Sequence, residues 1–228
     1  MEIKFLGTGG AFDYEKGTSA ALIDVAGKTI LIDAGFSTIL KMAEKDLFEK
    51  IDYILITHLH NDHVGSLPTL LAHYKHKLGV DMPPIIVPNE KFKAELQQLI
   101  NIPTGVDWGT YVSITEFPEI GFIDTTGQHV PGMTSYAYYF IEDDSLIYYS
   151  GDIANADTAK DFLADRTESK ITVFHETAFF KKSDVHTPYI EIQEKLDDYE
   201  LYAYHIDKAN KPDDCTLTLV EEVPELMV

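Results

Sequence analysis

Three histidines and an aspartate lie within six residues of one another, in Thr57-His58-Leu59-His60-Asn61-Asp62-His63. Neutral imidazole and carboxylate groups are the ligands that zinc prefers, and iron and manganese also accept them. A turn in this HxHxDH segment can direct His58 and His60 at one metal ion while Asp62 and His63 reach a second. A polar surface loop with chance histidines is the alternative. The apolar run Ile51–Thr57 before the motif is typical of a buried strand, which favours the metal site.

The elements that must position this motif follow from the hydrophobic pattern. We expect one domain over residues 1–228, of the α/β class, in which two strand-rich halves are each covered by helices in a four-layer αββα arrangement. The pattern predicts helices at Thr38–Lys45, Val64–His76, Glu90–Ile100 (capped by Asn89), Asp157–Ala164 and Tyr189–Leu196. It predicts strands at Glu2–Leu6, Ser19–Val25, Lys28–Asp33, Ile51–Thr57, Pro84–Val87, Tyr111–Ile114, Gly121–Gln128, Ser135–Ile141, Ser145–Tyr149, Ile171–His175 and Leu201–Tyr204.

With this motif and these elements, the chain resembles the metallo-β-lactamase superfamily. In that superfamily, later strand ends supply a further His, a bridging Asp and a final His. Here His129, Asp152 and His205 each follow a predicted strand, in that order. The resemblance implies the metallo-β-lactamase fold and two zinc ions per chain, with Mn²⁺ or Fe as substitutes. It places His58, His60 and His129 on one ion, Asp62, His63 and His205 on the other, and Asp152 between them.

A narrower resemblance is to the ribonuclease Z branch. The opening Phe5-Leu6-Gly7-Thr8-Gly9-Gly10-Ala11 is similar to the start of that branch, and His175-Glu176-Thr177-Ala178 is similar to its HEAT-type motif. Of its HST-type motif only His186 carries over, because Thr187 and Pro188 follow it. Within the branch the chain is most similar to small phage-type anti-Pycsar proteins, which hydrolyse cyclic nucleotides and pair as dimers. The resemblance therefore also implies a homodimer.

Three residues are candidates for catalysis. Asp62 can bind metal and also orient or deprotonate the attacking water. His186 is the candidate proton donor to the leaving oxygen of a phosphodiester, held and tuned by Glu176. A surface ion pair between Glu176 and His186, with no catalytic role, is the alternative.

Charge restricts the substrate. The chain has 38 Asp and Glu against 18 Lys and Arg, a net charge of −20. Such a surface repels a polyanion, since nucleic-acid binders gain much of their affinity from contacts between Lys or Arg and phosphates. The basic tRNA-clamping arm of ribonuclease Z is also missing from the sequence. We therefore expect a small substrate and no long nucleic-acid partner.

The remaining features bear on location. No apolar run reaches the ~20 residues of a membrane span, and the opening residues lack the regions of a signal peptide. The one cysteine, Cys215, cannot form an intramolecular disulfide. We expect a cytoplasmic protein without a membrane partner, which would act in the host cytosol if a phage encodes it.

These observations favour a dinuclear zinc phosphodiesterase. Its expected substrates are 3′,5′-cyclic nucleotides such as cCMP and cUMP, and also cAMP and cGMP, hydrolysed to linear monophosphates as an antagonist of cyclic-nucleotide anti-phage defence. Three alternatives stay open: a ribonuclease Z-type RNA 3′-processing endonuclease, a nucleotide-binding sponge that does not hydrolyse its ligand, and a diiron redox protein.

Overall fold

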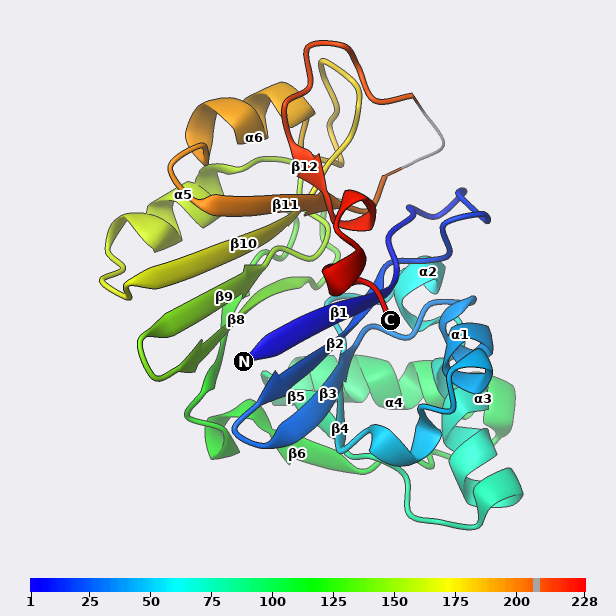
Figure 1. Cartoon of the computed structure of the whole chain (residues 1–228). Helices are drawn as coiled ribbons and strands as arrows, with labels where there is room; N and C mark the ends of the chain where they lie inside the picture. Colours follow the sequence, from blue (N-terminus) through cyan, green and yellow to red (C-terminus); the bar gives the residue numbers. More distant parts are fainter. Residues whose placement is uncertain (207–209) are drawn as a thin grey trace.

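Two six-stranded sheets lie face to face at the centre of the molecule, in a computed structural model that describes residues 1–206 and 210–228 (Figure 1). The first sheet has the order β1-β2-β3-β4-β5-β6, and the second has the order β12-β11-β10-β9-β8-β7. Helices α1, α3 and α4 lie outside the first sheet, and α5 and α6 lie outside the second (Figure 1). The predicted four-layer αββα arrangement is confirmed.

The elements have the following bounds. The strands are β1 (Glu2–Gly7), β2 (Ala20–Val25), β3 (Lys28–Ile32), β4 (Tyr53–Leu55), β5 (Ile85–Val87), β6 (Tyr111–Ser113), β7 (Ile120–Asp124), β8 (Tyr136–Glu142), β9 (Ser145–Tyr149), β10 (Lys170–Glu176), β11 (Glu200–Tyr204) and β12 (Thr218–Leu219). The α-helices are α1 (Thr38–Glu44), α2 (Asn61–Val64), α3 (Leu67–Ala72), α4 (Glu90–Thr104), α5 (Asp157–Ala164) and α6 (Tyr189–Lys195). A π-helical turn, His73–Leu78, follows α3, and short 3₁₀ turns occupy Phe48–Lys50, Ile114–Glu116, Val220–Glu222 and Pro224–Leu226.

Aromatic rings fill the space between the two sheets. Phe5 of β1 packs against Phe174 and Tyr204 of the second sheet, with ring centroids 5.4 Å apart in both pairs. All three rings are buried. The Tyr138 hydroxyl also crosses between the sheets and donates a hydrogen bond to the Ile56 carbonyl at 2.9 Å. Burying such large apolar surfaces is the main stabilisation of the two-sheet core, and it fixes one sheet against the other.

The strand directions bring the candidate site residues to one edge. In each half of the chain, two antiparallel pairings are followed by parallel ones: β3, β4 and β5 run parallel in the first sheet, and β9, β10 and β11 in the second. Parallel strands place their carboxyl ends at the same edge of a sheet, where α/β proteins gather binding residues. The HxHxDH motif follows β4, Asp152 follows β9 and His205 follows β11.

Most predicted elements are confirmed to within one or two residues. The helix predicted at Glu90–Ile100 begins at the expected Asn89 cap, whose side chain accepts a hydrogen bond from the Phe92 amide, but α4 continues to Thr104. The predicted helix Val64–His76 is confirmed only in part, because it is not continuous. The chain instead forms α2, breaks at Gly65–Ser66, and continues as α3 and the π-helical turn. The break has a local cause, because the amide and hydroxyl of Ser66 both donate to the Ala34 carbonyl, at 2.9 and 3.0 Å.

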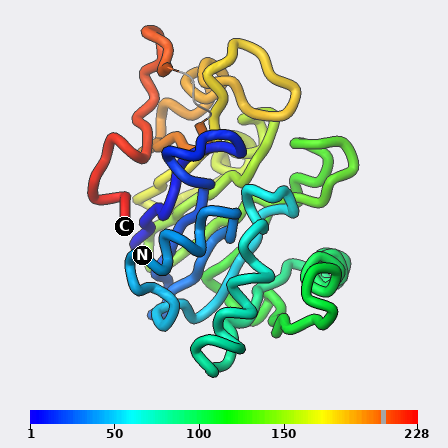
Figure 2. The backbone as a smooth tube through the Cα atoms, turned by 90° about the vertical axis from the view of Figure 1, so that its right-hand side faces the viewer, coloured from blue at the N-terminus to red at the C-terminus, as the bar shows by residue number. Residues whose placement is uncertain are grey.

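Two predicted strands are shorter than expected, and one part of the fold was missed. Ile51–Thr57 contains only the three residues of β4. Gly121–Gln128 ends as a strand at Asp124, and a turn follows in which the Gln128 amide donates to the Thr125 carbonyl. The hydrophobic pattern predicts neither β12 nor the two C-terminal 3₁₀ turns. This segment returns to the N-terminal strand, where Met227 pairs with Phe5 (Figure 2).

Candidate metal centre

The HxHxDH motif folds as a tight turn into α2. His58 follows β4, His60 precedes the helix, and Asp62 and His63 lie in its single turn. The amides of His63 and Val64 donate to the His60 carbonyl, which closes the turn. The loop after β3 packs directly on this turn, and a Cβ on Gly35 would overlap the Asp62 carbonyl. Glycine is therefore required for the motif to lie this close to its neighbour.

The other three predicted ligands lie in the second half of the chain. His129 comes from the turn after β7, which corrects the expectation that it directly follows a strand. Asp152 follows β9 through Gly151, whose φ of 59° falls in the left-handed region that glycine adopts without strain. His205 follows β11 and itself has a φ of 61°. A histidine in that conformation is uncommon and must be held by its surroundings, which is frequent at functional sites.

The Asp152 carboxylate lies at the centre of these side chains. Its Oδ2 atom is 3.3 Å from Nε2 of His205, 3.4 Å from Nε2 of His63, and 3.8 Å from Nε2 of both His58 and His129. The ligand atoms form two groups, each within 4.8 Å, that share Asp152: His58, His60, His129 and Asp152, and Asp62, His63, Asp152 and His205. All seven predicted ligands are thus brought together in the predicted partition.

Hydrogen bonds on the far side of the imidazoles orient them. The Asp33 carboxylate accepts from His63 Nδ1 at 2.7 Å and from the Thr57 hydroxyl at 2.9 Å, so that hydroxyl can accept from His58 Nδ1 at 3.0 Å. The Val185 carbonyl accepts from His129 Nδ1 at 2.6 Å. Since Nδ1 is the donor in each ring, Nε2 is the atom that faces Asp152. Metal-binding histidines are held in this way.

Asp33 is a functional residue that the sequence reasoning missed. It is fully buried, it follows β3, and its φ is 63°. One signal could have revealed it, because a carboxylate at the end of an apolar strand needs a buried partner. That partner, His63, lies far along the chain, and only the parallel pairing of β3 with β4 brings the two together.

The buried polar atoms of the site fit a bound cation. His58 Nε2 and Asp152 Oδ1 are buried and have no hydrogen-bond partner among the residues that the structure describes. Nε2 of His63 also faces Nε2 of His205 at 3.3 Å, and Nε2 of His129 faces Nδ1 of His60 at 3.0 Å. Buried polar atoms are costly when left unpaired, and a divalent metal ion in each ligand group would satisfy them.

Burial and charge shift the pKa values of the site strongly. Burial lowers the pKa of His58 well below its ordinary value, and the neighbouring His63 adds to the effect. Burial also opposes charge on His63, but Asp152 and Asp33 outweigh it and raise the pKa of His63 well above its ordinary value. The pKa of Asp152 is held low against burial by His205 and His63. The carboxylates thus favour positive charge at this point, which a metal ion supplies in place of a proton.

Glu176 and His186 lie beside the ligand groups, from β10 and from the loop that precedes α6. Glu176 is fully buried, which argues against a surface ion pair. Its Oε1 atom accepts hydrogen bonds from the amides of Thr187 (2.9 Å) and Ile153 (3.2 Å), and its Oε2 atom is 3.3 Å from His186 Nδ1. The His186 ring is 5.0 Å from that of His129 and 5.1 Å from that of His205, and its side chain is 24% exposed.

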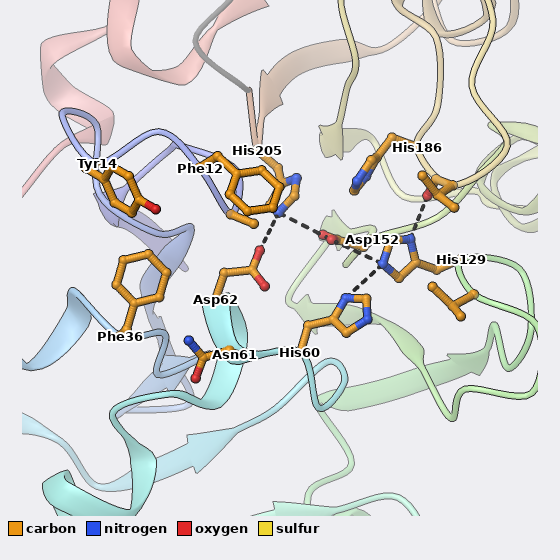
Figure 3. A pocket seen from close by; sticks show the side chains of 13 residues that line it. Phe12, Tyr14, Phe36, His60, Asn61, Asp62, His129, Asp152, His186 and His205 are labelled. Atoms are coloured by element: carbon orange, nitrogen blue, oxygen red, sulfur yellow. Dashed lines mark hydrogen bonds and ion pairs between the residues drawn. The ribbon is translucent and has the colours of Figure 1, made fainter.

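A cavity of about 490 Å³ opens over these groups. It is lined by His60, Asp62, His129, Asp152, His186 and His205 together with Ala11, Phe12, Tyr14, Phe36, Asn61, Val130 and Val185. Its volume falls within the range of small-molecule sites. Figure 3 shows Asp62 and Asp152 between His60 and His205, with His186 and His129 on one side and Tyr14 and Phe36 on the other.

Comparison with known proteins identifies the family. The family model of Anti-Pycsar protein Apyc1 matches residues 1–100. Anti-Pycsar protein Apyc1 of Paenibacillus sp. (strain J14) is 30% identical over 210 residues, which cover 84% of this chain and 82% of that protein. The chain belongs to the anti-Pycsar Apyc1 family. A ribonuclease Z of Clostridium tetani is 46% identical over 74 residues, 32% of this chain and 24% of its own length, as the ribonuclease Z-like motifs predicted.

The fold agrees with solved structures. The metallo-β-lactamase fold protein YhfI from Bacillus subtilis superposes with a TM-score of 0.73 at 17% sequence identity, over 99% of this chain and 92% of its own. The predicted metallo-β-lactamase fold is therefore confirmed. Together with the two clusters of histidine and aspartate, family and fold make this chain a metal-dependent hydrolase.

The role of Asp33 gives a first prediction. Asp33→Asn should weaken metal binding by about 10- to 100-fold, because it removes the charged acceptor that orients His63. Asparagine tolerates the left-handed backbone of this position, so the change tests the carboxylate and not the turn. The measurement is a competition titration against a chromogenic chelator, with circular dichroism to verify folding.

Asp24→Asn on β2 is the matched control, since it removes the same charge from an exposed position of the same sheet. It should bind metal like the unaltered protein. Equal affinities for Asp33→Asn and Asp24→Asn would contradict the orienting role of Asp33.

Proposed function

We propose that this protein is a dinuclear zinc phosphodiesterase that hydrolyses 3′,5′-cyclic mononucleotides to linear nucleoside monophosphates. The observation that carries the proposal is the position of Asp152, whose Oδ2 atom faces imidazoles of both ligand groups. A carboxylate shared in this way suits two cations. Membership of the anti-Pycsar family supports a role against cyclic-nucleotide anti-phage defence.

The donor set supports zinc, with Mn²⁺ or Fe as substitutes. Five imidazoles and two carboxylates provide the nitrogen and oxygen ligands that zinc binds, and no cysteine takes part. When bound, two such cations would polarise the phosphodiester and promote loss of a proton from the attacking water. The residues of the chain must then position that water and protonate the leaving oxygen.

We assign these two tasks to Asp62 and His186. Burial raises the pKa of Asp62, but hydrogen bonds with His205 and His63 outweigh it, so the carboxylate stays ionised. It can accept a hydrogen bond from the water and take its proton as the water oxygen bonds to phosphorus. The opposite P–O bond breaks, and His186 protonates the oxygen that leaves. Glu176, fixed by two backbone amides, holds and tunes the His186 ring.

Cavity size and net charge support a small substrate. The cavity of about 490 Å³ suits one nucleotide, and the net charge of −20 disfavours a long nucleic acid. None of the helices within residues 1–206 and 210–228 is both long and apolar enough to cross a membrane. A homodimer acting in the cytoplasm, or in the host cytosol if a phage encodes the chain, completes the proposal.

Substrate choice provides the second prediction. At physiological salt the metal-loaded protein should hydrolyse cyclic mononucleotides efficiently and precursor tRNA poorly, because repulsion of a polyanion still operates under these conditions. The measurement is kcat/KM on both substrates, with the products separated by chromatography. Efficient tRNA trimming without cleavage of cyclic nucleotides would favour the ribonuclease Z-type activity, and binding without linear product would favour a sponge.

The third prediction concerns His186. His186→Ala should retain its metal content and lose roughly 10²- to 10⁴-fold in kcat on a cyclic nucleotide, the usual contribution of general acid–base catalysis. On bis(4-nitrophenyl) phosphate it should be close to the unaltered enzyme, because a nitrophenolate leaves without protonation. Glu176→Gln should lose less, since it keeps an acceptor for the two amides and removes only the charge.

His76→Ala is the matched control. His76 is exposed in the π-helical turn and should tolerate the change without loss on either substrate. Equal losses for His186→Ala on natural and activated substrates would show that His186 is not the acid, and loss of metal in that variant would assign it a structural role.

A further inference from the structure

Two large hydrophobic side chains are exposed in the loop after β1. Phe12 is 74% exposed and Tyr14 is 75% exposed, although both lie within a few residues of the buried core. Exposed apolar surface of this kind gains nothing for folding, and when it borders a cavity it commonly marks a binding site. Both rings line the cavity over the candidate metal centre.

The loop holds the two rings in a defined position. Asp13, between them, is buried, and its Oδ1 atom accepts hydrogen bonds from the amides of Glu15 (3.1 Å) and Lys16 (3.2 Å). The Gly9 amide donates to the Gly17 carbonyl at 2.8 Å and closes the base of the loop. Lys16 forms an ion pair with Glu221 of the C-terminal turn at 2.8 Å. The exposure of Phe12 and Tyr14 is therefore imposed by the fold of the loop.

A third ring extends this surface. Phe36, in the loop that precedes α1, lies 6.0 Å from Tyr14 between ring centroids, at an interplanar angle of 53°. Figure 3 shows Tyr14 and Phe36 on the side of the cavity away from His129 and His186, with Asp62 between the two sides. The cavity thus has the aromatic rings of Tyr14 and Phe36 at one end and imidazole and carboxylate groups at the other.

We propose that Phe12, Tyr14 and Phe36 form a stacking platform for the base of the nucleotide whose phosphodiester is cleaved at the metal centre. The proposal rests on the proposed function. A cyclic mononucleotide has one planar aromatic group and one anionic diester, and the two ends of the cavity match them. Base–aromatic stacking tolerates every base, because each has a π-face.

The lining also indicates how many phosphates the substrate carries. Among the described residues that line the cavity there is no Lys or Arg. A second phosphate would therefore meet no cationic side chain among these described lining residues, and a net charge of −20 would oppose it. The platform accordingly favours a cyclic mononucleotide over a cyclic dinucleotide.

The test measures binding separately from turnover. The probe is a slowly hydrolysed 3′,5′-cyclic phosphorothioate of adenosine, titrated calorimetrically into the metal-loaded protein. Phe12→Ala and Tyr14→Ala should each raise Kd by roughly 5- to 100-fold, the range expected for loss of one base–aromatic contact. Tyr14→Phe should bind normally, because the ring and not the hydroxyl makes the contact. Phe180→Ala is the matched control, since Phe180 is 56% exposed and does not line the cavity.

A substrate without a base completes the test. On 1-deoxyribose 3,5-cyclic phosphate, Phe12→Ala and Tyr14→Ala should keep the kcat/KM of the unaltered enzyme. Equal losses with and without the base would overturn the platform, and so would unchanged Kd values in both variants. A change of oligomeric state with unchanged Kd would overturn it too, by assigning the rings to a contact between copies of the chain. An unaltered enzyme that cleaves bis(4-nitrophenyl) phosphate but neither binds nor cleaves cyclic nucleotides would overturn the proposed function and the platform together.

Discussion

Asp152 lies among buried imidazoles and a second carboxylate, and segments from both sheets hold this cluster together. Four imidazole nitrogens lie within 3.8 Å of one carboxylate oxygen, in a place almost without solvent. Such a cluster is stable only with a compensating positive charge. Both halves of the fold position this cluster, because parallel strands of each sheet end beside it. Asp33 and His205 adopt left-handed backbone conformations there. Gly35 and Gly151 allow close contacts that a side chain would prevent.

Much of this arrangement could be predicted because its signals are local or follow strand order. HxHxDH is a short motif after an apolar run, and Asp152 and His205 follow strands whose hydrophobic pattern is clear. Parallel strands then bring their carboxyl ends together, which explains why these side chains meet. Their division into two ligand groups came from the resemblance to the metallo-β-lactamase superfamily. The roles of Glu176 and His186 were predicted from the family resemblance alone, because a Glu–His pair has no specific spacing in a sequence. The errors in the predicted elements lie at two kinds of place. At Ser66 the chain forms hydrogen bonds with a loop that is distant in the sequence, and before His129 a turn separates the histidine from its strand.

The remaining features depend on contacts between segments that are remote in the sequence. Asp33 looks like the end of an ordinary strand until β3 pairs with β4 and brings it to His63. Phe12 and Tyr14 lie in a glycine-rich turn, where their sequence gives no sign of exposure. Their loop is fixed partly by the ion pair of Lys16 with Glu221, in a C-terminal segment for which no element was predicted.

We propose that the Asp152 carboxylate is shared by two metal ions. Crystals of the zinc-loaded protein, with anomalous diffraction collected at the zinc edge and elemental analysis of the same preparation, test this directly. We expect two ions per chain, one in each ligand group, with Asp152 bound to both. A single ion per chain, or two ions that have no shared carboxylate ligand, would contradict it.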